Sequence, residues 1–193
     1  MQPEDPKTVL RAELRAKRAQ LKHDHPDAAV RAALAFEAAG LGPFGIAAIY
    51  HPLGSELDPF PLAAVLSRHG CRIALPVVIA RAAPLVFRLE SEAGGLPPDA
   101  LGIPAPPPDA PAVRPDLVIC PLVGFDAFGG RLGQGGGYYD RTLAQLRAAG
   151  PVTAIGLGYA GQELSCLPAG PFDQRLDGVL TERGWFPAKT ELT

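Results

Sequence analysis

The stretch LVICPLVGFDAFGGRLGQGGGYYD, residues 117–140, decides the fold. Residues 117–123 are the most apolar run of the chain and predict a buried strand. A glycine-rich loop follows over residues 124–137, and residues 138–149 have the spacing of a helix. A strand, a glycine-rich turn and a helix in this order are typical of an α/β layered fold with a mostly parallel sheet flanked by helices.

The rest of the chain alternates between strand and helix patterns in the same way. Apolar spacing predicts three more helices, over residues 6–21, 27–39 and 61–69. Further strands are predicted over residues 45–50, 72–78, 85–89, 152–158 and 178–181, the last of the chain. Asp5 and Pro6 are suited to begin the first helix, and the proline-rich residues 96–115 predict an irregular surface loop.

Composition limits the class of protein. The chain has 193 residues, 47% of them hydrophobic, which predicts a single domain over residues 1–193. A net charge of −2 gives no sign of a nucleic-acid binder. No apolar run reaches the roughly 18 residues of a membrane span, and the charged start lacks a secretory signal. Cys71, Cys120 and Cys166 fit neither a disulfide framework nor a zinc site. We therefore expect a reduced, cytoplasmic monomer.

The glycine-rich loop is the first candidate site. In parallel sheets, ligands bind beyond the carboxyl ends of the strands, where this loop lies. Backbone N–H groups of glycines can converge on phosphate oxygens, and the N-terminus of the next helix favours anions. Arg131 could clamp a phosphate, and Asp140 could hold Mg²⁺. The loop is neither a Walker A motif nor a dinucleotide fingerprint, so an ordinary turn is the alternative.

Charged residues elsewhere could complete such a site. Lys7, Arg11 and Arg15 recur every four residues and share one helix face, as a solvated surface or as an anion clamp. Glu56 lies in the turn after the first strand, where it could accept hydrogen bonds from a heterocycle or be a surface acid. His51 lies beside this turn.

Two other features have open interpretations. Asp173 and Asp177 flank Arg175 before the last predicted strand, and either could be a second metal carboxylate or a turn former. Cys120 falls inside the apolar strand and is interpreted as an inert core thiol.

Together these motifs resemble the 5-formyltetrahydrofolate cyclo-ligase family, also called 5,10-methenyltetrahydrofolate synthetase. The specific element is GRLGQGGGYYDR, residues 130–141. Weaker elements follow the family's order over nearly the whole chain: Lys7 with Leu10-Arg11, YHPLGSELD at residues 50–58, GIP at 102–104, GLGY at 156–159, and the segment 172–177.

The resemblance implies an enzyme that uses ATP and Mg²⁺ to convert 5-formyltetrahydrofolate into 5,10-methenyltetrahydrofolate, releasing ADP and phosphate. By matching position, it implies Arg131 and Asp140 as catalytic residues and Asp140 and Asp173 as metal ligands. It implies ATP contacts from Lys7, Arg11, Arg131, Leu132, Gly133, Gln134, Gly135, Gly136, Gly137, Tyr138 and Tyr139, to which helical spacing adds Arg15. The folate contacts implied are His51, Glu56, Gln134, Gly135, Gly136, Gly137 and Tyr138. A non-catalytic folate- or nucleotide-binding relative and a different α/β enzyme, acting on phosphorylated sugars or acyl-CoA, are the alternatives.

Overall fold

The computed structural model describes residues 6–90 and 96–190, so the predicted role of Asp5 lies outside it. Within these residues the helices are α1 (Pro6–Asp24), α2 (Ala28–Ala38), α3 (Phe60–Arg68), α4 (Tyr138–Ala148) and the short 3₁₀ helix η1 (Ala160–Gln162). The strands are β1 (Ile46–Ala48), β2 (Arg72–Val77), β3 (Val86–Leu89), β4 (Ala112–Val113), β5 (Leu117–Pro121), β6 (Gly124–Asp126), β7 (Arg131–Leu132), β8 (Thr153–Leu157), β9 (Glu163–Leu164), β10 (Gly178–Thr181) and β11 (Gly184–Pro187).

The main sheet has eight strands in the order β11-β10-β8-β5-β1-β2-β3-β4. Its five central strands, from β10 to β2, pair in parallel. The pairs at both edges are antiparallel. The predicted α/β fold with a mostly parallel sheet is therefore confirmed, and the apolar strand β5 lies in its centre.

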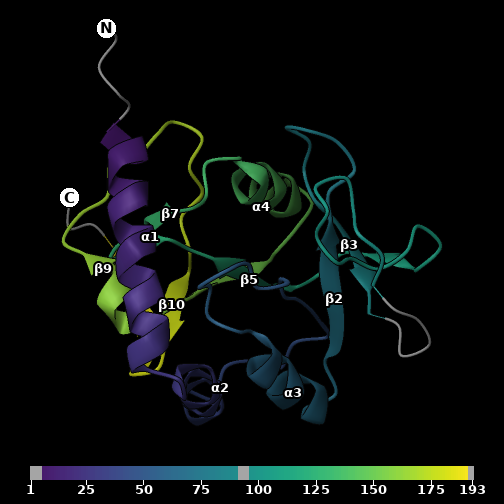
Figure 1. Cartoon of the computed structure of the whole chain (residues 1–193). Helices are drawn as coiled ribbons and strands as arrows, with labels where there is room; N and C mark the ends of the chain where they lie inside the picture. The colour runs from purple at the N-terminus through teal and green to yellow at the C-terminus, as the bar shows by residue number, and fades with distance from the viewer. Residues whose placement is uncertain (1–5, 91–95, 191–193) are drawn as a thin grey trace, which may run out of the picture.

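Helices cover both faces of this sheet, as Figure 1 shows with α4 on one side and α2 and α3 on the other. Phe36 of α2 and Leu62 of α3 are buried in the apolar core on one face of the sheet. Leu143 of α4 is fully buried in the core on the opposite face. Strands enclosed on both faces need apolar side chains throughout, which is why residues 117–123 contain so few polar ones.

α1 lies apart from these layers, beside a small sheet of order β7-β6-β9 (Figure 1). Leu14 of α1 packs with Val123, Leu132 and Leu167 in a separate apolar cluster. This packing brings one face of α1 toward the segment that links β5 to α4.

Three predictions about strands were wrong. Residues 124–137 do not form a loop throughout, because β6 and β7 pair as a hairpin in which Asp126 Oδ1 accepts hydrogen bonds from the N–H groups of Phe128 and Gly130. Residues 178–181 are not the last strand, since β11 follows a turn at Glu182-Arg183, which lacks the usual Asn-Gly signal. The proline-rich loop also contains β4, which pairs with β3.

Candidate functional site

A cavity of about 320 Å³ opens at the carboxyl ends of β1, β2 and β5. Its volume is in the range of small-molecule sites, and its place in the sheet is where ligands bind in parallel α/β folds. It is lined by these predicted site residues: Lys7, Arg11, His51, Glu56, Arg131, Leu132, Gly133, Gln134, Gly135, Gly136, Gly137, Tyr138, Tyr139, Asp140 and Asp173. The residues predicted from separate segments therefore meet in one place.

Arg131 and Asp140 form an ion pair across the glycine-rich turn. β7 places the guanidinium and the first turn of α4 places the carboxylate, with Arg131 Nη2 3.0 Å from Asp140 Oδ1. The Arg131 side chain is 4% exposed and stands over the ring of Tyr139 at 5.5 Å. Its Nε is buried and has no hydrogen-bond partner. A donor in this state can donate a hydrogen bond to a ligand oxygen without first breaking a bond within the protein.

The glycine-rich turn presents the N-terminus of α4 to the cavity. Gly137 has a φ of +64°, in the left-handed region that glycine adopts without strain, and α4 starts there without a side-chain cap. Arg11 of α1 donates from Nε to the carbonyl of Gly133 at 3.0 Å. An uncapped helix start beside two arginines is a suitable environment for an anion.

Lys7 and Asp173 close the same end of the cavity. Lys7 Nζ lies 2.7 Å from Asp173 Oδ2, which also accepts a hydrogen bond from the N–H of Gly170 at 2.7 Å. Desolvation alone would raise the pKa of Asp173, but the hydrogen bonds from Lys7 and Gly170 outweigh it and lower this pKa below its ordinary value of 3.8. Asp177 instead accepts a hydrogen bond from the N–H of Ala154 in β8.

Glu56 also lines the cavity, in a part called here the Glu56 end, and it is not a surface acid, because it is only 4% exposed. Its Oε2 accepts a hydrogen bond from the N–H of Leu53, and its Oε1 accepts one from Gln134 Nε2, both at 3.0 Å. The adjacent ring of His51 has a buried Nδ1 with no hydrogen-bond partner. Burial first, then the charge of Glu56, raises the pKa of Tyr50 well above 10. The cavity is also lined by apolar side chains, including Val78, Leu85, Leu101 and Ile103.

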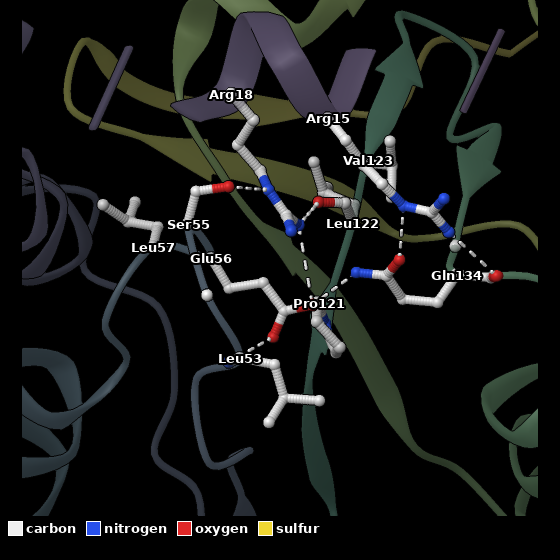
Figure 2. Close-up of polar contacts among 12 residues, drawn as sticks. Arg15, Arg18, Leu53, Ser55, Glu56, Leu57, Pro121, Leu122, Val123 and Gln134 are labelled. Carbon is white, nitrogen blue, oxygen red and sulfur yellow. Dashed lines mark hydrogen bonds and ion pairs between the residues drawn. The ribbon is translucent and has the colours of Figure 1, made fainter. Parts of the chain in front are cut away.

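Arg15 is not among the described residues that line the cavity. Its Nε donates to Gln134 Oε1 at 2.9 Å, so it holds a lining residue from behind (Figure 2). Sequence reasoning missed Arg18, which is 3% exposed and lies 3.5 Å from Glu56. Arg18 follows Arg15 by three positions on the same helix face, and this spacing was the available signal.

The remaining predictions concern cysteines, metals and membranes. Burial raises the pKa of Cys120 to about 12, as expected of an inert core thiol. The cysteines are free. Among residues 6–90 and 96–190, no group of three or more His, Cys, Asp or Glu side chains is arranged to hold a metal ion. None of the helices in the described segments has the length and apolar character of a bilayer span.

Sequence comparison decides the family. Residues 3–182 match the family description "5-formyltetrahydrofolate cyclo-ligase family". The chain belongs to this cyclo-ligase family. As the resemblance predicted, it is an enzyme of that family.

Relatives of this cyclo-ligase agree over most of the chain. The 5-formyltetrahydrofolate cyclo-ligase of Escherichia coli is 36% identical over 139 residues, which cover 69% of this chain and 76% of the relative. That of Mycolicibacterium smegmatis is 34% identical over 141 residues, covering 69% and 72%.

Solved structures share the fold of this cyclo-ligase. The 5,10-methenyltetrahydrofolate synthetase of Mycoplasma pneumoniae has a TM-score of 0.71 and 26% identity, with 92% of this chain and 99% of that chain covered. The Aquifex aeolicus 5,10-methenyltetrahydrofolate synthetase has a TM-score of 0.75 and 25% identity, with coverages of 97% and 95%.

Proposed function

We propose that this protein converts 5-formyltetrahydrofolate and ATP into 5,10-methenyltetrahydrofolate, ADP and phosphate. The observation that carries the proposal is one cavity lined by two kinds of polar group. The glycine-rich end has an uncapped helix start with Arg131 and Asp140, and the Glu56 end has a buried carboxylate, with apolar side chains also in the lining. A triphosphate suits the first end, and a polar heterocycle with an apolar body suits the second.

The chemistry we propose needs no nucleophile from the protein. The formyl oxygen of the substrate attacks the γ-phosphorus of ATP, the bond to the β–γ bridging oxygen breaks, and ADP leaves. The folate N10 then attacks the activated formyl carbon, and the C–O bond breaks to release phosphate that carries the former formyl oxygen. Loss of the N10 proton accompanies closure of the ring. Catalysis of phosphoryl transfer consists mostly of positioning and charge stabilisation, which fixed cationic side chains can supply.

In this proposal the cationic residues hold the nucleotide. Arg131 stabilises the charge that develops on the transferred phosphoryl group, because its buried Nε is a donor that a phosphate oxygen could use. Lys7, Arg11 and the turn from Leu132 to Tyr139 bind the remaining phosphates and the nucleoside. Arg15 contributes by fixing Gln134 rather than by contact.

The carboxylates of this end fit a nucleotide that arrives with Mg²⁺. Asp140 and Asp173 both line the cavity beside the cations, and a bare triphosphate would meet their negative charges. Mg²⁺ is bound through one or two carboxylates together with phosphate oxygens, so these two residues would hold it. When bound, the ion neutralises phosphoryl charge and favours attack on the γ-phosphate.

The other end is proposed to bind the folate. Glu56 accepts hydrogen bonds from N–H groups of the pterin ring, His51 offers its buried Nδ1, and residues 134–138 contact the reacting side of the ring. Leu101 and Ile103 would cover the apolar body of the substrate. In this proposal the formyl group lies between the residues that bind the nucleotide and those that bind the pterin ring.

The test is a direct assay. Purified protein with ATP, Mg²⁺ and 5-formyltetrahydrofolate is expected to produce the near-ultraviolet absorbance of the methenyl product. Omitting ATP, omitting Mg²⁺ or replacing the substrate with tetrahydrofolate should each remove the signal. Binding of both ligands without any product at high protein concentration would replace this proposal with the non-catalytic alternative.

A further inference from the structure

The cavity is supported from behind by a buried ion pair between Arg18 of α1 and Glu56. The two side chains are each 4% exposed, and Arg18 Nη1 lies 3.5 Å from Glu56 Oε1. Glu56 lines the cavity, whereas Arg18 does not line it in the described part of the chain. Two fully desolvated charges are costly to bury, so their arrangement calls for a reason beyond stability.

Arg18 is held by contacts with two other segments of the chain. Its Nε donates to Ser55 Oγ at 3.1 Å, and its Nη1 donates to the carbonyl of Leu122 at 2.9 Å (Figure 2). The guanidinium therefore ties α1 to the turn that carries Glu56 and to the residue that follows β5. Its planar shape sets the direction of each of these bonds.

Glu56 is linked in turn to the glycine-rich end. Gln134 donates from Nε2 to Glu56 Oε1, and its Oε1 accepts from Arg15 Nε (Figure 2). Arg15 and Arg18 lie three positions apart and face the same side of α1. Polar contacts therefore connect four side chains in a chain that begins and ends on α1: Arg18, Glu56, Gln134 and Arg15.

We propose that Arg18 is a positioning residue, which holds the carboxylate of Glu56 in the direction that the second substrate requires. The inference rests on the proposed function, because that function makes Glu56 a folate contact. Arg18 compensates the charge of a carboxylate that is cut off from water, so both carboxylate oxygens stay directed by protein donors. Through Gln134, the same arginine also steadies the turn where the nucleotide is proposed to bind.

The first experiment compares Arg18→Met with Arg18→Lys. Arg18→Met keeps the apolar stem and removes the charge, so the KM for 5-formyltetrahydrofolate should rise roughly ten- to a hundredfold. The KM for ATP should change much less, because Lys7, Arg11 and Arg131 remain. Arg18→Lys restores the charge without the planar fork, so its KM should lie between those of Arg18→Met and the unchanged protein.

Lys22→Met is the matched control. Lys22 lies on the same helix and donates to the carbonyl of Gly54 in the same turn, at 2.8 Å, without touching Glu56. It should leave both KM values unchanged. If Arg18→Met and Lys22→Met shift both KM values alike, Arg18 only holds the helix in place and the inference is overturned.

A second experiment separates this inference from the proposed function. It measures the affinity of the protein for 5-formyltetrahydrofolate by calorimetry in the absence of ATP. Weaker binding in Arg18→Met supports the positioning role even if the unchanged protein never forms product. Equal binding and an equal KM in a folded Arg18→Met protein overturn it while leaving the proposed function intact.

A further variant covers the case in which Arg18→Met does not fold. Ser55→Ala removes the acceptor of Arg18 Nε and leaves the ion pair, so the KM for the folate should rise about two- to fivefold. An unchanged KM in both Ser55→Ala and Arg18→Lys would overturn the inference.

Discussion

Two arginine–carboxylate pairs shape the cavity, one in its lining and one partly behind it, and the pairs differ in their exposure to water. At the glycine-rich end, the Arg131 side chain is 4% exposed and that of Asp140 is 21% exposed. At the other end, Arg18 and Glu56 are both 4% exposed. A partly exposed carboxylate can exchange its partner for a ligand at low cost, whereas a buried one loses too much by separating. The first pair is therefore suited to act on a ligand, and the second to hold a fixed direction.

The largest effect is expected from Asp140→Asn, which keeps the shape of the first pair and removes its negative charge. Turnover should fall by roughly 10³-fold, because the proposed Mg²⁺ would lose a carboxylate ligand while Arg131 loses its charged partner. The assay of methenyl formation measures this, with circular dichroism to show that the fold is kept.

Asp109→Asn is the control for this prediction, because Asp109 is an exposed carboxylate in the proline-rich stretch and does not line the cavity within the described residues. Its turnover should equal that of the unchanged protein. Near-normal turnover in Asp140→Asn would remove Asp140 from the proposed metal site.

The second prediction tests the buried pair through stability. Glu56→Leu leaves Arg18 charged and without its carboxylate, which should lower the free energy of unfolding by about 3–5 kcal/mol. The double variant Arg18→Met/Glu56→Leu removes both charges and should regain most of that loss. Urea denaturation of the single and double variants gives both values, and a double variant no more stable than Glu56→Leu would contradict the role of charge compensation.

The same contrast explains what the sequence could predict. The glycine-rich end is encoded locally: an apolar strand, closely spaced glycines, and Arg131 and Asp140 on either side of them. Even Lys7 and Arg11 could be predicted to lie at this site, because helical spacing places them on one face and the resemblance to the family implies a role for them. The structure then brings these residues into one cavity.

The other end depends on contacts that the sequence does not show. Arg18 contacts Glu56 because α1 packs beside the segment that follows β5, where Leu14 lies in an apolar cluster. The β6–β7 hairpin was hidden among glycines, since its turn is held by the side chain of Asp126 rather than by a standard dipeptide. In each case tertiary packing supplied the information that local propensity lacked.

A third prediction sharpens the comparison at the glycine-rich end. A Cβ added at Gly133 would lie 2.8 Å from Arg131 Nη1, so Gly133→Ala should displace the guanidinium from Asp140. We expect kcat/KM for ATP to fall about tenfold, which is about 1.4 kcal/mol of transition-state stabilisation. The KM for 5-formyltetrahydrofolate should change less, and an unchanged kcat/KM for ATP would show that Arg131 can move without cost.

The smallest effect is expected at Lys7 and Asp173, the most exposed of the three pairs, with side chains 22% and 38% exposed. Because the folded protein lowers the pKa of Asp173, the ionised carboxylate stabilises the fold above its unfolded pKa, and this contribution is lost as pH falls through the lowered value. Asp173→Asn should therefore reduce the free energy of unfolding by no more than about 1 kcal/mol at neutral pH. The difference from the unchanged protein should shrink toward zero on acidification below the lowered pKa, as measured by urea denaturation at a series of pH values. A difference that stays constant with pH would mean that the ionisation of Asp173 contributes nothing to stability, contrary to this prediction.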